Sequence, residues 1–369
     1  MKIDFHKLYS YLIKNVKIKN IEPTCFLRNV NSMRITVPLR LSGGISSTIY
    51  AFSLIFSESN EYKKLDFILK AYDKCEKVKC HNEGMILKAL YHKNFPVPYV
   101  YKVETSDKFL GVPFILMEKV NGIPLGVYLK KIPPNGRFAI IKRFAETLSS
   151  LHSLNWDDLK FLRQPVDAYD YARRQGDAAK LLQKNLNVAS DFDAVLNWIE
   201  ENANKHPCYH YSILHGDMHL DNFLVTENGK IVAVDWEIPE IGDPLKDIAL
   251  AYHNLIFAFG PQRLKEGLDV ARFFIHEIKS LNKDIDNSKL CFYVVSSALI
   301  EMICYKFRCK QFLNPLIAVQ KMGAKYFLAF PLLCWYFWWR SRLLERFILN
   351  EVKSINKISD TLPAKATKI

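Results

Sequence analysis

The sequence lacks a cysteine pattern that would bind zinc, and it contains no internal repeat or block of low complexity. Its eight cysteines are scattered and none forms a Cys-x-x-Cys pair. The spacings of Cys75 with Cys80 and of Cys304 with Cys309 match no common zinc site. The first residues also lack the pattern of a signal peptide. We therefore expect a cytoplasmic protein whose cysteines are reduced thiols.

The most apolar stretch of the chain, residues 327–339, lacks the length to span a bilayer. It would extend about 20 Å as a helix, whereas a hydrocarbon core is about 30 Å thick. Pro331 interrupts the stretch, and the basic residues Arg340 and Arg342 follow it. We expect a buried core helix over residues 326–339. The alternatives are an aromatic belt on a membrane surface and an aromatic cage for a quaternary ammonium group.

The middle of the chain has little net positive charge. Residues 1–40 carry 8 Lys and Arg against 2 Asp and Glu, a net +6, and residues 340–369 carry 7 against 3, a net +4. Together the two ends account for 10 of the net charge of +13. A nucleic-acid-binding protein would show a basic stripe through its fold, so we expect no nucleic-acid partner. We expect solvated basic ends, with a peripheral membrane contact through the C-terminus as the alternative.

Two short motifs on either side of a hairpin carry the chemistry. Residues 215–222 read His-Gly-Asp-Met-His-Leu-Asp-Asn, and residues 235–237 read Asp-Trp-Glu. In a phosphoryl-transfer site, one Asp orients the acceptor hydroxyl and an Asn five residues later binds Mg²⁺. A second Asp, beyond a hairpin, holds the metal against the nucleotide phosphates. Asp217, Asn222 and Asp235 follow this layout, which predicts a kinase site.

The hairpin between the motifs can be given a register. Residues 223–225 and 231–234 are short apolar runs flanking Asn228-Gly229, a strong signal for a two-residue loop. Such a loop pairs Glu227 with Lys230 and, further along, places Asn222 directly opposite Asp235, roughly 5 Å apart at Cβ. That separation suits Mg²⁺, which prefers oxygen donors. An error of one residue would put the two side chains on opposite faces. The alternative is a surface hairpin with polar ends.

With these motifs the chain resembles the aminoglycoside phosphotransferase and choline kinase family of protein-kinase-like small-molecule kinases. The family signature is His-Gly-Asp-x-His-x-x-Asn, then Asp-Trp-Glu or Asp-Trp-Asp, then Gly-Asp-Pro-x-x-Asp, the last standing here as residues 242–247. Protein kinases usually have Arg in place of Gly216, and Phe-Gly where this chain has Trp236 and Glu237. The resemblance therefore favours a metabolite kinase over a protein kinase.

The resemblance implies an α+β, bilobal protein-kinase-like fold. Its N-terminal lobe would hold an antiparallel sheet with one main helix, and its larger C-terminal lobe would be mostly helical. With 369 residues, 49% of them hydrophobic, the chain fits two lobes of one catalytic domain. We expect an N-terminal extension and nucleotide-binding lobe over residues 1–120, a catalytic and substrate-binding lobe over 121–350, and a basic tail over 351–369.

The resemblance also implies roles for the motif residues. Asp217 would orient the acceptor hydroxyl and accept its proton, while His215 would anchor the loop. Asn222 and Asp235 would hold Mg²⁺, and Glu237 would act through a second metal or a water.

Other motif residues are expected to support the fold. Asp243 and Asp247 would cap backbone donors at a helix start. Arg173 and Arg174 would form a solvated basic face, with the binding of an anionic substrate as the alternative. His219 would be structural or lie near the acceptor. Asp221 has no assigned role.

The parts that bind ATP are expected upstream. Residues 34–41 alternate as a strand, residues 48–56 are rich in β-formers, and a glycine turn lies between them. Two strands joined by a glycine turn form the type of loop whose backbone covers phosphates. The alternative is an ordinary hairpin turn. The residues of this predicted phosphate-covering loop are Ser42, Gly43, Gly44 and Ser46.

A lysine and a glutamate should complete the phosphate site. Residues 66–72 resemble the third strand and place Lys70 where the phosphate-pairing lysine is expected. Residues 77–90 have helical periodicity that puts Glu83 on the apolar stripe. An ionised carboxylate there needs a partner, and Lys70 is the natural one. The alternatives are a solvated lysine and a glutamate that reaches solvent.

Adenine recognition is assigned by position only. Residues 114–118 read as a buried strand, and residues 119–122 would be the hinge whose backbone contacts the adenine edge. Glu118 and Val120 are the candidate residues.

The predicted function is an ATP- and Mg²⁺-dependent kinase of a small hydroxyl-bearing molecule. The alternatives are a lipid or alcohol kinase at a membrane surface, a protein kinase, and a nucleotide-binding regulator without turnover. Neither the acceptor nor the oligomeric state can be read from the sequence.

Overall fold

The computed structural model describes residues 7–8, 10, 33–41, 47–58, 61–186, 193–283 and 285–312. By its internal contacts the chain divides into two compact units. Unit 1 comprises Met1–Arg163 with His215–Glu240, and unit 2 comprises Gln164–Leu214 with Ile241–Ile369. Unit 1 thus combines the N-terminal sheet with the two motifs of residues 215–222 and 235–237. The predicted lobe boundary at residue 120 and the basic tail stay predictions.

Unit 1 begins with a six-stranded antiparallel sheet of order β1-β3-β4-β6-β5, in which β2 also pairs with β3. Its strands are β1 Met33–Ile35, β2 Leu39–Leu41, β3 Ser47–Glu58, β4 Glu61–Tyr72, β5 Val100–Glu104 and β6 Phe114–Glu118. β3 and β4 form a long hairpin, with Ser47 opposite Tyr72 at one end and Glu58 opposite Glu61 at the other. Alternate side chains of this hairpin are buried. Among them, Phe52 and Phe67 stack with their ring centroids 5.4 Å apart.

The predicted strand over residues 34–41 is wrong as a continuous element. It is two short strands, β1 and β2, separated by three residues that end at Pro38, which has no amide hydrogen to donate to a ladder. Two apolar positions of the alternating pattern are exposed, Val37 at 91% and Leu39 at 66%. The alternation therefore does not mark a buried face here.

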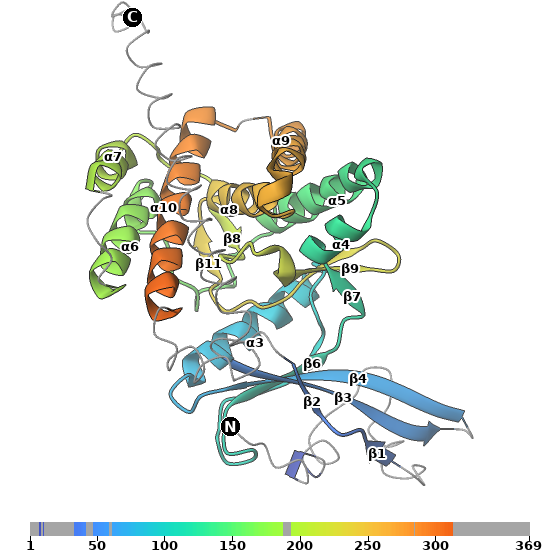
Figure 1. The fold of residues 1–369 in the computed structure, drawn as a ribbon. Helices are drawn as coiled ribbons and strands as arrows, with labels where there is room; N and C mark the ends of the chain where they lie inside the picture. The colour runs from blue at the N-terminus through green and yellow to red at the C-terminus, as the bar shows by residue number, and fades with distance from the viewer. Residues whose placement is uncertain are drawn as a thin grey trace, which may run out of the picture. The chain divides into compact units, whose positions relative to one another are not determined.

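One long helix, α3 Lys77–His92, accompanies the sheet and contacts β5 and β6 (Figure 1). It begins where the sequence predicts and runs two residues further. Its buried residues are Cys80, Glu83, Gly84, Ile86, Leu87 and Leu90. The apolar stripe of an amphipathic helix packs on the sheet, and this stripe carries Glu83 inward with it. The predicted antiparallel sheet with one main helix is therefore confirmed.

The rest of unit 1 frames the catalytic motifs. The elements are β7 Gly122–Pro124, α4 Leu125–Lys131, α5 Pro134–His152, the 3-10 turn η1 Leu220–Asn222, β9 Phe223–Thr226 and β10 Ile231–Ala233. The strands form a second sheet of order β10-β9-β7. Phe144 of α5 packs edge-on against Phe223 at the start of β9, with centroids 4.8 Å apart. The sheet that carries the motifs is thereby anchored to a long helix.

The predicted register of the β9–β10 hairpin is wrong by one residue. Val225 lies opposite Ile231 rather than Val232, because the loop has three residues instead of two. The amide of Gly229 donates to Thr226 O at 2.8 Å, and Gly229 adopts φ +74°. This is the three-residue turn that ends in a left-handed glycine, which the same Asn-Gly pair also supports.

Unit 2 is mostly helical (Figure 1). Its elements are α6 Asp170–Leu186, α7 Asp193–Ala203, β8 Ser212–Leu214, β11 Glu240–Gly242, α8 Pro244–Ile256, the 3-10 turn η2 Pro261–Arg263, α9 Leu264–Leu281 and α10 Asn287–Phe312. β8 and β11 pair with each other. α10 contacts α6, α7 and α8, while α9 packs on α8. α10 is thus the central helix of the unit, and the predicted helical remainder of an α+β chain is confirmed.

Among the described residues, one segment, Asn287–Cys304 of α10, is long and apolar enough to cross a membrane by length and composition. Of that segment, 61% is buried inside the protein, as in the core helix of a soluble domain, so it is weak support for a membrane span. Five of the eight cysteines have side chains that the structure describes, and all five are free thiols. The predicted phosphate-covering loop, the apolar stretch over 326–339 and the basic tail all lie outside the described residues.

Candidate active site

An ion pair between β4 and α3 forms the centre of the candidate site. Lys70 Nζ lies 2.8 Å from Glu83 Oε1 and 3.0 Å from Oε2, and both side chains are buried. The hydroxyl of Tyr72, two residues further along β4, donates to Glu83 Oε2 at 2.7 Å. The pair predicted from the helix periodicity is present, and Tyr72 is an additional partner that periodicity does not indicate.

Burial and charge act in opposite directions on this pair. Burial alone would lower the pKa of Lys70, but the negative charges of Glu83, Asp235 and Glu237 raise it above its ordinary value. Burial raises the pKa of Glu83 more than Lys70 and Tyr72 lower it. Lys70 is therefore positively charged at neutral pH, and its ammonium group pairs with more than one acidic side chain.

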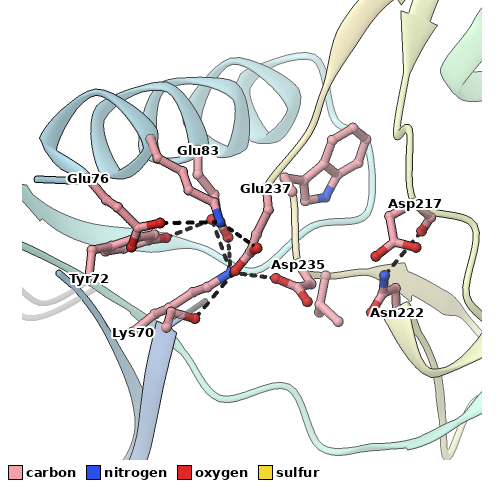
Figure 2. Close-up of polar contacts among 12 residues, drawn as sticks. Lys70, Tyr72, Glu76, Glu83, Asp217, Asn222, Asp235 and Glu237 are labelled. Carbon is pink, nitrogen blue, oxygen red and sulfur yellow. Dashed lines mark hydrogen bonds and ion pairs between the residues drawn. The ribbon is translucent and has the colours of Figure 1, made fainter. Parts of the chain in front are cut away.

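Asp235 reaches Lys70 through an unusual backbone conformation. Asn222 O accepts a hydrogen bond from Val234 N at 2.8 Å, so Asn222 lies opposite Val234 and the predicted pairing of Asn222 with Asp235 is wrong. Asp235 then leaves the ladder with φ +65°, a left-handed conformation that Asp tolerates better than most residues. From there its Oδ1 pairs with Lys70 Nζ, as Figure 2 shows. Strained backbone of this kind is concentrated at functional sites.

Glu237 is held by three side chains. Its Oε1 lies 2.9 Å from Lys70 Nζ and accepts from Ser47 Oγ at 3.3 Å. Its Oε2 accepts from Lys79 Nζ at 2.7 Å. Sequence reasoning missed both Ser47 and Lys79. Lys79 precedes Glu83 by four residues on the same helix, a spacing that could have shown that the two share one face.

Trp236, between the two acids, fixes this segment in the core. It is fully buried, and its indole N–H donates to Ala233 O at 3.3 Å. Its ring packs against His215, with centroids 4.4 Å apart, and against the edge of Phe95. Because Trp236 points inward, its neighbours Asp235 and Glu237 are left on the side of Lys70.

His215 anchors the predicted catalytic loop, residues 215–222. Its Nε2 lies 3.0 Å from Val234 O, and its Nδ1 accepts from Asp217 N at 3.3 Å. Gly216 has φ +79°, and a Cβ there would lie 2.3 Å from Ile238 O. Only glycine fits both the conformation and the space, which explains why the arginine usual in protein kinases is absent here.

Asp217 and Asn222 lie at the two ends of this loop. The Asn222 amide nitrogen donates to Asp217 O at 3.1 Å, so its side-chain oxygen is the end available to a metal. Asp217 has a side chain that is 35% exposed, with His219 Nε2 3.7 Å from its carboxylate. The carboxylate of Asp217 can therefore be reached by an acceptor, while its backbone holds Asn222.

The donors gathered here fit a hard cation. Oxygens of Glu83, Asp235 and Glu237 all lie within 4.8 Å of one another. The side chain of Asp235 is 39% exposed, whereas that of Glu83 is almost fully buried on Lys70. Carboxylate and amide oxygens are the ligands that Mg²⁺ prefers. Asp235 and Asn222 fit that ion best among the predicted ligands, because Glu237 has both oxygens engaged by lysines.

Backbone amides at the predicted hinge form hydrogen bonds within the sheet. The amide of Glu118 donates to Tyr99 O at 2.8 Å, so that amide serves the sheet. Lys119 N is likewise bonded to Asp66 O at 3.0 Å. A role for Glu118 or Val120 in adenine binding stays a prediction.

The third motif, in unit 2, supports the fold. Asp243 is the N-cap of α8, and its Oδ1 accepts from Leu245 N at 3.1 Å, as predicted. Its Oδ2 lies 2.5 Å from Lys289 Nζ, a partner that sequence reasoning missed. The prediction of a solvated face is wrong for Arg174, which is buried, pairs with Asp170 and donates to Gln164 O at 2.8 Å.

Comparison with known sequences agrees with this geometry. A model of the phosphotransferase enzyme family matches residues 40–277, more than half of the chain. The human protein named acyl-CoA dehydrogenase family member 11 is 31% identical over 188 residues, which are 49% of this chain and 23% of that protein. Family member 10 from Mus musculus is 30% identical over 186 residues, 46% of this chain and 16% of that protein. The chain thus spans about a quarter or less of the length of these relatives.

Solved structures show the same fold. A protein from Ralstonia eutropha assigned as an aminoglycoside phosphotransferase has a TM-score of 0.63 at 17% identity, covering 92% of this chain and 99% of its own. A type I macrolide 2'-phosphotransferase has a TM-score of 0.56 at 13% identity, covering 89% and 97%. A thermostable aminoglycoside phosphotransferase in complex with ADP and hygromycin B has a TM-score of 0.55 at 16% identity, covering 81% and 94%. By its family match, its motifs and its fold, the chain belongs to the phosphotransferase enzyme family.

Proposed function

We propose that this chain is a kinase that transfers the γ-phosphate of ATP to a hydroxyl group of a small molecule, with Mg²⁺. The observation that carries the proposal is the contact of Lys70 with both Glu83 and Asp235. It joins a strand lysine, its helix glutamate and the acid after the catalytic hairpin, which are the parts that handle nucleotide phosphates in kinases. The ADP bound to a related phosphotransferase supports the choice of an adenine nucleotide.

In this proposal Asn222 and Asp235 hold Mg²⁺, which when bound neutralises charge on the phosphates. Lys70 adds positive charge beside the phosphates that are not transferred, and Glu83 with Tyr72 keeps its ammonium in place. Because these charged groups are held in place before the substrates bind, they need little reorganisation during phosphate transfer.

Asp217 acts on the acceptor. It orients the hydroxyl group and accepts its proton as the oxygen attacks the γ-phosphorus. Its amide is fixed by His215, and its exposed carboxylate can meet a substrate. Since the transition state is loose, positioning of the hydroxyl is the main contribution expected from this residue.

The acceptor remains a class rather than a compound. The structural relatives described above carry the names of aminoglycoside and macrolide phosphotransferases, which supports a hydroxyl acceptor. The curated relatives are named acyl-CoA dehydrogenases, so hydroxy acids and their thioesters belong among the acceptors to test. The cytoplasmic location and the membrane contact through residues 326–369 stay predictions.

The experiment is a measurement of Mg²⁺-dependent ADP release with pooled acceptors: amino sugars, sugars, amino alcohols, hydroxy acids with their thioesters, and a lipid extract. Wild type should release ADP faster with one pool. Asp217→Asn should lower that rate by at least about 10²-fold, the contribution expected of a general base, while nucleotide binding is kept.

Asp221→Asn is the matched control, because Asp221 is an exposed carboxylate on the same loop. It should transfer phosphate at the wild-type rate. Normal turnover by Asp217→Asn would contradict the proposal. Intact nucleotide binding without stimulation by any pool would point to a protein substrate or a regulator without turnover.

A further inference from the structure

Glu237 already has a cationic partner at each oxygen. Lys70 contacts Oε1 at 2.9 Å and Lys79 contacts Oε2 at 2.7 Å. The Glu237 side chain is 20% exposed and that of Lys79 is 25% exposed, so the second contact is largely shielded from solvent. Neither the proposed transfer nor the predicted roles use Lys79.

Lys79 and Glu83 lie four residues apart on α3 and therefore share one face of that helix. From this face, Glu83 extends to the lysine of β4 and Lys79 extends to the acid that follows β10. The helix thus supplies one acid and one base to the same cluster. Glu76, one turn before Lys79, lies 3.9 Å from its ammonium group and adds to its negative surroundings.

We propose that Lys79 is a positioning residue whose ammonium group is the permanent counter-ion of Glu237, so that Glu237 takes no metal ion of its own. Mg²⁺ is then held by Asn222 and Asp235 alone among the predicted ligands. This inference rests on the proposed function, because it concerns the metal that accompanies the nucleotide.

Competition between the tethered ammonium and a free ion supports this assignment. Mg²⁺ gives up its water reluctantly and needs near-ideal octahedral ligands. To reach Glu237 it would have to displace an ammonium group that is already 2.7 Å from the carboxylate and fixed to the chain. Asp235 is different, because its side chain is more exposed, at 39%, and its only described cationic partner is Lys70. The two acids of the Asp-Trp-Glu motif therefore have separate tasks.

The test counts the metal ions bound with nucleotide. Mn²⁺, which replaces Mg²⁺ and is visible by electron paramagnetic resonance, is titrated into full-length protein saturated with ADP. Lys79→Met removes the counter-ion, and we expect one more Mn²⁺ per ADP than in wild type. In the double variant Lys79→Met with Glu237→Gln, the count should return to the wild-type value, because the freed carboxylate is gone.

Three controls make the result specific. Lys77→Met removes a charge from an exposed position on the same helix and should leave the count unchanged. Lys79→Arg keeps the charge and should also retain the wild-type count. Glu237→Gln alone should leave the count unchanged. Lys79→Gln, which keeps a polar side chain, replaces the Met variant if that protein does not fold.

Two results would overturn the inference. One is loss of a bound Mn²⁺ in Glu237→Gln alone, since Glu237 would then be a ligand in the wild type. The other is a count in Lys79→Met equal to that of wild type. If wild-type protein binds no ADP with Mn²⁺, the proposed function fails first and the inference fails with it. If ADP and Mn²⁺ bind but the number of Mn²⁺ ions per ADP differs from the expected number, only the role of Lys79 is contradicted.

Discussion

Two clusters of acids and lysines, one in each unit, are built differently. In unit 1 the Lys70 cluster consists of Lys70, Lys79, Glu83, Asp235 and Glu237, so three carboxylates face two ammonium groups and the sum is −1. In unit 2 the Asp243 cluster sets one carboxylate against Lys289 and the backbone amide of Leu245 in α8, and the sum is zero. The first cluster has negative charge to spare, whereas the second is balanced.

Exposure differs in the same sense. Asp243 is 1% exposed, and Tyr293 and Cys208 are buried near it. Burial, followed by the charge of Asp243, raises the pKa of Cys208 to about 12, so the thiol stays neutral. Asp235 in the other cluster is 39% exposed. An acid that is buried and neutralised by a partner stabilises the fold. An acid that is partly exposed, in a cluster with excess negative charge, is suited to bind a cation that comes with a substrate.

The largest effect should come from the exposed acid of the Lys70 cluster. Asp235→Ala should abolish Mg²⁺-dependent nucleotide binding and lower turnover by at least about 10³-fold, or about 4 kcal/mol of transition-state stabilisation. Isothermal titration of ADP with and without Mg²⁺, together with ADP release, measures both. Asp243→Asn, in the other cluster, should leave the Mg²⁺ dependence unchanged. A loss of metal dependence in both variants would remove the distinction between the clusters.

The next largest effect should come from the lysine that balances the cluster. Lys70→Met leaves Glu83 buried with Tyr72 and should lower the free energy of unfolding by about 3–5 kcal/mol. The double variant Lys70→Met with Glu83→Gln should recover part of the loss, because no buried charge is left unpaired. Urea unfolding measures both. Equal stabilities for the two variants would show that the burial of Glu83 is not the cause.

The same double variant has a defined pH dependence. Folding raises the pKa of Lys70 above its ordinary value of 10.5, despite burial, because of its three acidic partners. Such a base contributes its full stability below pH 10.5 and loses it as the pH rises through the higher folded value. The difference in unfolding free energy between wild type and the double variant Lys70→Met with Glu83→Gln, in which no buried acid is left to titrate, should therefore stay constant from neutral pH to about pH 10. A difference that shrinks near pH 8 would contradict the assignment.

A smaller effect is expected at the balanced cluster. Lys289→Met should lower the free energy of unfolding by about 2 kcal/mol, less than Lys70→Met, because Asp243 keeps its bond to the backbone of α8. Mg²⁺-dependent nucleotide binding should be unchanged. Adding Asp243→Asn to Lys289→Met should restore stability, since Asn is an equally good helix N-cap. A change in metal dependence would show that this cluster is not purely structural.

The sequence could predict what depends on local periodicity. The strands over residues 48–56 and 66–72, the helix α3 and the inward orientation of Glu83 follow from patterns within a few residues, and all are present. The strand over 34–41 failed because alternation shows only that one face is apolar, not that anything covers it.

Parts of the site depend on contacts between distant segments, which no local pattern contains. Lys79 and Glu237 are separated by 158 positions, and Lys70 and Asp235 by 165. The left-handed backbone of Asp235 is imposed by its surroundings, since nothing in the sequence requires it. The residue types of the site could thus be predicted, but the geometry that unites them could not.

The smallest effect concerns the β9–β10 turn, which precedes Asp235 and Glu237 of the Lys70 cluster in the chain. The Asn-Gly pair allows a loop of two or three residues, and the structure has three, with Gly229 in the left-handed conformation. Gly229→Ala should cost about 1–2 kcal/mol of unfolding free energy, because an L-residue is disfavoured there. Nucleotide binding should weaken only slightly, since Trp236 holds the following segment in the core independently of the turn.

Gly136→Ala is the matched control for this turn. Gly136 lies in α5, where a new Cβ would meet only Ile132 Cδ1 at 3.8 Å. Alanine should therefore stabilise this helix by up to about 1 kcal/mol. The two Gly→Ala changes have opposite expected signs for the same added methyl group. At Gly229 the new Cβ would also displace the flexible Arg143 guanidinium, so thermal unfolding of both variants tests whether the loss of stability belongs to this turn. A loss at Gly229 no larger than any change at Gly136 would show that Gly229 does not hold the left-handed conformation on which the three-residue turn depends.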